Sequence, residues 1–175
     1  LKVLKGSYMY EHASEYGLIY RTKPPYEVLA SKWVSYDEML EIRLVEEMLE
    51  LHYNSGQFLT YLAVLEQRYA SAFQMFLDMG HFYRSNGYLD CSHNRVRRTE
   101  IVLEFAESVD AGHRAAYEEA LIFDLYKIEK SKSRPIWARD LALEKKKTSA
   151  YLRAHGLEKN TVIWRNLTGW MHGEL

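Results

Sequence analysis

The sequence predicts a mainly α-helical fold: a bundle-like domain of six to seven helices, with a small strand contribution at the two ends of the chain. Apolar residues recur at three- and four-residue steps through most of the chain, which is the period of an α-helix. Three prolines in 175 residues leave room for long helices. The breaks between periodic segments are short, and short breaks favour antiparallel neighbouring helices.

The N-terminal part of the chain is predicted to hold little regular structure. Residues 1–5 alternate apolar and basic side chains, as a short strand does. A short helix is expected over Tyr8–Tyr16, and Gly17 is expected to end it in a left-handed conformation. Pro24-Pro25 removes two backbone donors, so residues 18–34 are predicted to form an extended, ordered connector.

The clearest helix begins at Ser35, which stands with Glu38 in the S-x-x-E register of a capping box. Its apolar stripe is Met39, Ile42, Val45, Leu49 and His52. Further helices are expected at about 57–69, 72–86, 95–109, 114–130 and 138–155. Their predicted core positions include Phe58, Leu62, Leu65, Tyr69, Phe73, Phe76, Leu77, Tyr83, Val102, Phe105, Val109, Tyr117, Leu121, Leu125 and Ile128. Gly80 lies on one of these stripes and would let a neighbouring helix approach closely.

The end of the chain is predicted to differ from this helical part. Residues 131–135 form a polar linker, and residues 161–164 have strand character. The predicted organisation is therefore an N-terminal segment at 1–34, a helical domain at 35–156 and a C-terminal extension at 157–175.

Composition excludes several classes of protein. A net charge of −1 gives no overall attraction to nucleic acid or to an anionic membrane. No apolar run approaches the ~20 residues that a membrane span needs. The single cysteine, Cys91, excludes an internal disulfide framework and is typical of the cytoplasm.

Four short segments carry a resemblance to a known family. They are Lys-Val-Leu-Lys-Gly-Ser at 2–7, Glu-Tyr-Gly-Leu at 15–18, Pro-Pro-Tyr-Glu-Val-Leu at 24–29 and Tyr-Asn-Ser-Gly-Gln-Phe at 53–58. Together they resemble the helical C-terminal domain, a domain of unknown function, of cobalamin-binding radical S-adenosylmethionine (SAM) enzymes. These enzymes are relatives of anaerobic magnesium-protoporphyrin IX monomethyl ester cyclase. The resemblance is strongest over the first half of the chain.

The resemblance implies an oxidoreductase or methyltransferase-type enzyme with a cobalamin domain and a radical SAM barrel upstream. Residues 1–34 would then be the end of that barrel and its connector, and the helical part would pack on the barrel and shape access to it. SAM, a [4Fe–4S] cluster and cobalamin would belong to the upstream part. We expect no cofactor and no catalytic residue in this chain, and no turnover by it alone, because three cysteine thiolates are the usual minimum for such a cluster.

Aromatic residues near the proposed barrel junction form the first candidate site. Tyr26, Trp33, Phe58 and Tyr61 are a candidate surface for a substrate or partner, and core packing is the alternative for each. If exposed after separation from the barrel, such a surface would favour a homodimer of the fragment.

Two further candidates carry charge. Arg95, Arg97 and Arg98 form a candidate anion site, unless they pair with nearby glutamates. Asp124 lies in an apolar run and is a candidate buried carboxylate, with either a raised pKa or partners at a neighbouring helix end.

Seven histidines are scattered without the i, i+4 spacing of a helical metal site, so no metal site is predicted. Two hypotheses of other classes stay open: a free-standing helical scaffold that binds a partner protein, and a tetrapyrrole-binding module. Nucleic-acid binding is disfavoured.

Overall fold

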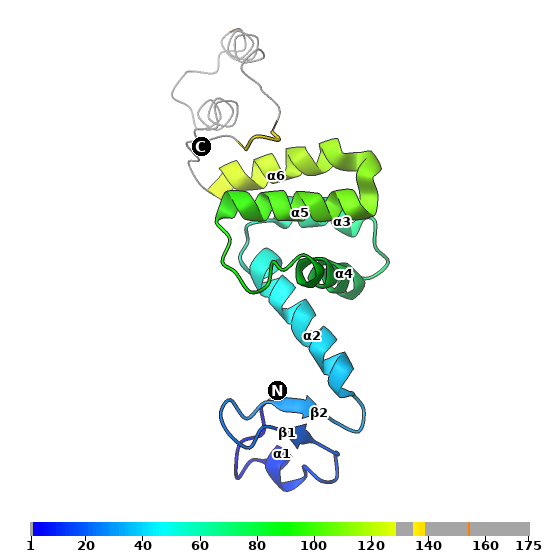
Figure 1. The fold of residues 1–175 in the computed structure, drawn as a ribbon, viewed down its shortest axis with the longest axis vertical. Helices are drawn as coiled ribbons and strands as arrows, with labels where there is room; N and C mark the ends of the chain where they lie inside the picture. Colours follow the sequence, from blue (N-terminus) through cyan, green and yellow to red (C-terminus); the bar gives the residue numbers. More distant parts are fainter. Residues whose placement is uncertain (1, 129–134, 139–153, 155–175) are drawn as a thin grey trace.

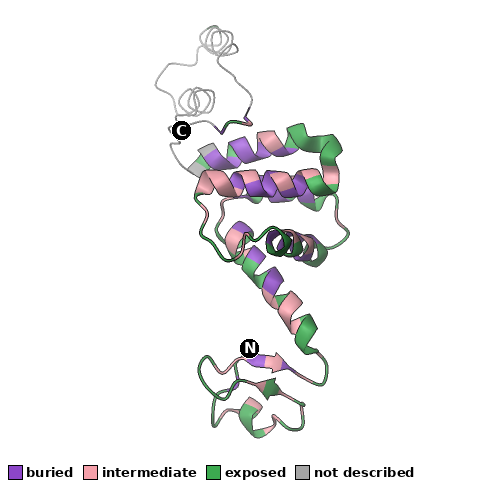
Figure 2. Ribbon diagram, viewed as in Figure 1, coloured by how far each residue is buried: buried purple, intermediate pink, exposed green. Residues whose placement is uncertain are grey.

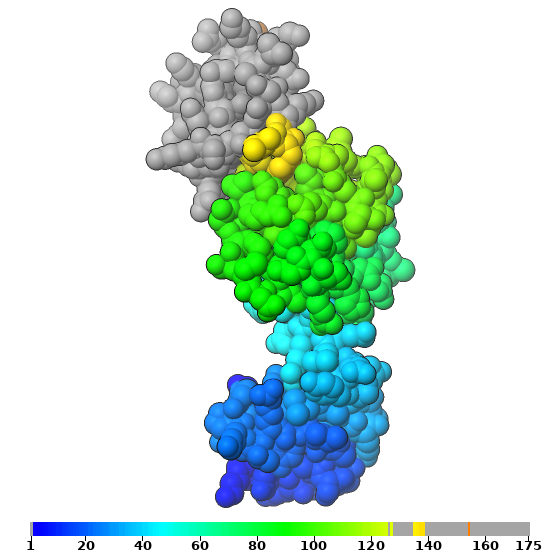
Figure 3. Space-filling model, in the orientation of Figure 1, coloured from blue at the N-terminus to red at the C-terminus, as the bar shows by residue number. Residues whose placement is uncertain are grey.

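The computed structural model describes residues 2–128, 135–138 and 154. It consists of an N-terminal unit (residues 2–34) and a helical lobe (residues 36–128). The first helix of the lobe leads from the N-terminal unit to the other helices (Figure 1). The space-filling view in Figure 3 shows a narrow waist at this junction.

The N-terminal unit is built on a small hairpin. Strands β1 (Ile19–Tyr20) and β2 (Val28–Ala30) pair antiparallel, and Lys2 forms an isolated bridge with Glu27 beside them. The extended connector predicted at 18–34 is therefore a hairpin, and the strand predicted at 1–5 is reduced to this bridge.

The predicted helix at Tyr8–Tyr16 is mostly wrong. Helix α1 spans only Tyr8–Glu11 and buries no residue. A segment this short gains too little from burial to sustain more than one turn. Gly17 is in the left-handed region, with φ of 58°, as predicted, and it reverses the chain where the backbone of Lys32 lies against it.

The capping box at Ser35 is confirmed. Helix α2 (Tyr36–Met48) begins after Ser35, whose side chain accepts the Glu38 N–H at 3.3 Å while the Glu38 carboxylate accepts the Ser35 N–H at 2.7 Å. The helix continues as one turn of π-helix, η1 (Leu49–Asn54). Gly56, with φ of 68°, follows it.

The rest of the helical lobe consists of four long helices. They are α3 (Leu59–Glu66), α4 (Ala72–Ser85), α5 (Arg95–Asp110) and α6 (Arg114–Ile128), with a 3₁₀ turn, η2 (Ala111–His113), before the last. Helices α3, α5 and α6 pack together, while α2 packs on α4 (Figure 1). The mainly helical class is confirmed, with five helices of eight or more residues in the described part.

Some predictions fall outside the described residues. They are the helix at 138–155, the strand at 161–164, the extension at 157–175 and most of the linker at 131–135.

Helices α2 and α4 approach closely at Gly80, as predicted. A Cβ atom at this position would lie 2.4 Å from Cγ of Leu44, so only glycine fits without displacing the leucine side chain. The buried residues lie mainly between the helices of the lobe (Figure 2). The largest fully buried side chains are Tyr61, Tyr83, Tyr117, Phe58, Phe105, Met48, Leu65, Met79, Ile101, Leu121, Leu125 and His52.

Three predicted core positions are exposed: Ile42, Phe73 and Val109. Ile42 lies in the half of α2 that leads toward the N-terminal unit, and Phe73 and Val109 lie in the first turn of α4 and the last turn of α5. Apolar periodicity does not show where a helix extends beyond its neighbour. Among the described helices, none combines the length and the apolar content that a bilayer crossing requires.

Candidate functional site

The four aromatic residues predicted as one surface are not brought together. Phe58 and Tyr61 are buried in the core of the helical lobe, where the Tyr61 hydroxyl donates to the Val102 carbonyl at 2.6 Å. For these two residues the structure agrees with the core-packing alternative, because the apolar stripe of α3 faces α6 rather than solvent. Tyr26 is half-buried in the N-terminal unit, and Trp33 is 65% exposed.

Asp124 has a structural role at a helix end. It is 3% exposed, and its two carboxylate oxygens accept the Tyr61 N–H at 2.9 Å and the Thr60 N–H at 3.2 Å. These donors open α3, whose own N-cap residue, Phe58, has no side-chain hydrogen bond to offer. Asp124 on α6 therefore caps α3, and of the two roles predicted for it the helix-end role is the one that the geometry supports.

The three arginines at the start of α5 do not form one anion site. Arg97 pairs with Glu100 and Glu104, both at 3.0 Å, and Tyr88 donates its hydroxyl to Glu104 at 2.9 Å. The two glutamates neutralise the charge of Arg97, as predicted by the alternative in which the arginines pair with nearby glutamates. Arg95 is half-buried at the first position of the helix, whereas Arg98 lines a pocket.

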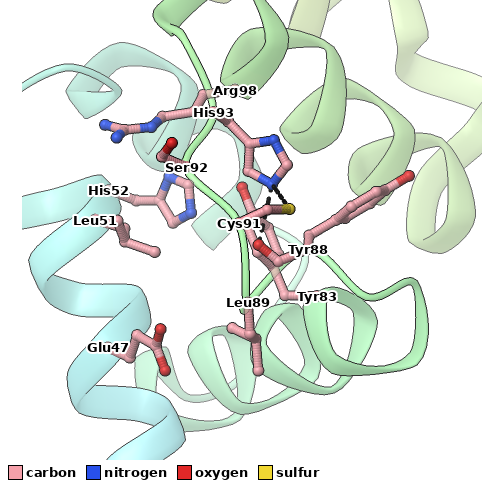
Figure 4. Close-up of a pocket in the computed structure, with 10 residues that line it drawn as sticks. All are labelled: Glu47, Leu51, His52, Tyr83, Tyr88, Leu89, Cys91, Ser92, His93 and Arg98. Carbon is pink, nitrogen blue, oxygen red and sulfur yellow. Dashed lines mark hydrogen bonds between the residues drawn. The ribbon is translucent and has the colours of Figure 1, made fainter.

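This pocket lies between η1, the end of α4 and the segment that leads into α5, and it has a volume of about 120 Å³ (Figure 4). We call it the His52 pocket. Its lining residues are Glu47, Leu51, His52, Tyr83, Tyr88, Leu89, Cys91, Ser92, His93 and Arg98.

His52 is fully buried. Its ring packs edge-on against Phe58 and Tyr83, with ring centroids 5.2 and 5.4 Å away. Neither ring nitrogen has a partner among the described residues. Burial, together with the positive charge of Arg98, lowers the pKa of His52 to about 3. His52 is therefore neutral at pH 7 and offers one N–H donor and one bare nitrogen.

Tyr83, which packs against the His52 ring, repeats this pattern. Its side chain is 2% exposed, and its hydroxyl has no partner among the described residues. Burial raises its pKa well above the ordinary value, partly offset by the charge of Arg98. The hydroxyl therefore stays protonated and remains available as a donor.

At the rim of the pocket, the side chains of His93 and Cys91 do have hydrogen-bond partners. His93 places Nε2 at 3.0 Å from the Tyr88 carbonyl and at 3.4 Å from Sγ of Cys91 (Figure 4). Across the described part of the chain, no three His, Cys, Asp or Glu side chains come together as metal ligands would. Glu47 of α2 is exposed and completes the lining.

Only parts of this pocket could be found in the sequence. His52 and Tyr83 lie on the apolar stripes predicted for their helices, and Arg98 belongs to the predicted basic cluster. No sequence signal links the three, because they come from three separate segments that meet only in the fold.

A second hollow lies between α3 and α4, next to η1. Its volume is about 300 Å³, and its lining is mostly apolar: Tyr53, Leu59, Leu62, Ala63, Glu66, Ala72, Met75 and Phe76. The tetrapyrrole hypothesis gains no support from either pocket. The His52 pocket is smaller than the ~300–1,000 Å³ that drug-sized ligands usually occupy, and the second hollow has no histidine in its lining.

One comparison with known proteins gives a family. Residues 14–168 match the family described as "Protein of unknown function (DUF4080)". No curated protein and no solved structure matches the chain. The family description names no activity, so it does not link the chain to radical SAM or cobalamin enzymes. The match covers most of the sequence, and the chain therefore belongs to the DUF4080 family.

Proposed function

We propose that this chain is a helical accessory domain of a cobalamin-dependent radical SAM enzyme of oxidoreductase or methyltransferase type. Its helical lobe would pack on the barrel and shape access for a substrate or partner, and residues 1–34 would be the end of the barrel and its connector. The proposal rests on the four sequence segments described above, and the observation that carries it is the exposed apolar surface of the N-terminal unit.

That surface consists of large apolar side chains left in solvent. We call it the N-terminal apolar surface; its members are Leu4, Tyr8, Tyr10, Ile19 and Trp33. The same unit buries only Val3, Val28 and Ala30 as hydrophobic core. Units below about 40 residues rarely build a sufficient core of their own. A larger body that covers this surface would supply the missing burial.

The position of the first residues favours an upstream body as the cover. The backbone of Lys2 forms a β-bridge with that of Glu27, and the Val3 N–H donates to the Tyr26 carbonyl at 2.8 Å. The first residues therefore lie beside β2 (Figure 1). A preceding barrel would therefore lie next to the N-terminal unit.

The chain itself does not fit the cofactors of such an enzyme. A radical SAM cluster needs three cysteine thiolates, and the sequence contains one cysteine. SAM, the cluster and cobalamin are thus assigned to the upstream part. We assign the enzyme to the cytoplasm, whose reducing conditions suit both a cluster and the unpaired thiol of Cys91.

The first test is the natural reading frame upstream of Leu1. We expect a C-x-x-x-C-x-x-C motif within a run of alternating strands and helices. A frame that begins at Leu1 or just before it would overturn the proposal and favour the free-standing scaffold.

The second test substitutes Trp33 in the full-length protein. Trp33→Ala should lower the free energy of unfolding by about 2 kcal/mol more in the full-length protein than in the isolated chain, because only there is the side chain covered. Phe73→Ala, an exposed aromatic of the helical lobe, is the matched control and should cost the same in both. Equal costs for Trp33→Ala in the two contexts would show that the upstream body does not cover this surface.

The isolated chain offers a simpler measurement. With its N-terminal apolar surface uncovered, we expect it to form a homodimer at high concentration. Sedimentation should show a monomer–dimer equilibrium that Trp33→Ala shifts toward the monomer and Phe73→Ala leaves unchanged. A monomer at every concentration would contradict this expectation.

A further inference from the structure

The His52 pocket combines a positive charge with buried donors that find no partner in the described part of the chain. His52 is fully buried and Tyr83 is 2% exposed, and the polar side-chain atoms of both lack hydrogen bonds among the described residues. Buried polar groups are almost always satisfied, so unsatisfied ones that face one cavity indicate a missing partner. Arg98 takes part in none of the ion pairs found among the described residues.

We propose that the His52 pocket binds a small oxyanion, a carboxylate or phosphate group, through Arg98 with help from the His52 N–H and the Tyr83 hydroxyl. Arginine offers several donors in one plane and is well suited to oxyanions. A cavity of about 120 Å³ matches roughly four water volumes of ~30 Å³, which is the size of such a group.

The surrounding charges favour an anion over a cation. Arg97, the neighbouring cation on α5, is already neutralised by Glu100 and Glu104, so Arg98 carries the net charge on the α5 side of the pocket. Glu47 lines the same pocket from α2 and opposes this charge, but its exposure to solvent screens its carboxylate. This site lies in the helical lobe, so it does not depend on the proposed docking of the N-terminal unit.

Calorimetric titration with inorganic phosphate and with acetate, at pH 7 and constant ionic strength, tests the proposal. At ligand concentrations up to about 10 mM the wild-type chain should bind at least one of the two and gain thermal stability accordingly. Arg98→Gln should weaken binding at least tenfold. Arg84→Gln removes the same charge from the exposed end of α4 and should leave binding unchanged.

The outcomes separate clearly. Binding of phosphate alone assigns the site to phosphate groups, and binding of acetate alone assigns it to carboxylates. Tyr83→Phe preserves the buried ring and should weaken binding severalfold, which keeps the test decisive if Arg98→Gln does not fold. No binding by the wild type, or equal binding by wild type, Arg98→Gln and Tyr83→Phe, would overturn the proposal and leave the pocket to water.

Discussion

Two buried polar side chains of the helical lobe, Asp124 and His52, have opposite surroundings. The carboxylate of Asp124 accepts two backbone N–H groups at the start of α3, so its charge is compensated within the fold. His52 has no hydrogen-bond partner among the described residues and faces a pocket. Asp124 holds two helices together, whereas His52 has room in the pocket for a partner that the described residues do not supply.

The comparison predicts its largest effect at Asp124. Asp124→Ala should lower the free energy of unfolding by about 3 kcal/mol, because it leaves two N–H groups at a buried helix end without an acceptor. Urea unfolding of the variant measures the loss. Asp90→Ala, in the exposed loop before α5, is the control and should cost less than about 0.5 kcal/mol. Equal losses of unfolding free energy in the two variants would show that Asp124 does not stabilise the start of α3.

A smaller effect is expected from the protonation of His52. Its pKa is lowered to about 3 in the folded chain, against about 6.5 unfolded, so below pH 6.5 the unfolded chain binds a proton that the folded chain excludes. Stability contributed by neutral His52 is therefore complete at pH 7 and lost as the pH falls from about 6.5 toward 3. Between pH 7 and 5 the loss is about 2 kcal/mol.

Urea unfolding in chloride buffer at these two pH values measures that loss. His52→Leu should remove it, whereas His81→Leu, which changes an exposed histidine of α4, should retain it. An unchanged pH dependence in His52→Leu would mean that His52 is accessible to protons in the folded chain.

The smallest effects sharpen the same contrast with two buried tyrosines. Tyr61→Phe should cost about 1.5 kcal/mol, because its hydroxyl donates to the Val102 carbonyl. Tyr83→Phe should change the free energy of unfolding by less than about 0.5 kcal/mol, because no described residue loses a hydrogen bond. Thermal unfolding compares the two, and a larger cost for Tyr83→Phe would reveal a partner bound tightly in the pocket.

The sequence predicts most of the local structure of the lobe. The Ser35 and Glu38 capping box and the close approach at Gly80 depend on a few adjacent residues or on one side chain, and both are confirmed. The role of Asp124 was one of two alternatives, because a carboxylate beside an apolar stripe needs a partner of some kind. Which helix end would supply that partner depends on how α3 meets α6.

What could not be predicted depends on contacts between distant segments. The sequence around Phe58 and Tyr61 does not distinguish these buried residues from an exposed aromatic such as Trp33. Only the packing of α3 on α6 buries them. The hairpin at 19–30 has strands of two and three residues, too short to show a strand period. The His52 pocket needs three segments to meet, so none of them carries its signature alone.

Helix α2 and its π-helical extension join the N-terminal unit to the His52 pocket in the helical lobe. Arg43 donates to the Val28 carbonyl at 2.9 Å and pairs with Glu27 at 3.1 Å, which clamps the helix to the N-terminal hairpin. His52 lies nine residues further along the same rod, about 13 Å away at 1.5 Å per residue. Arg43→Gln should therefore alter hydrogen exchange around His52, and unchanged exchange there would show that the clamp transmits nothing. We therefore expect α2 to couple the position of the N-terminal hairpin to the wall of the His52 pocket.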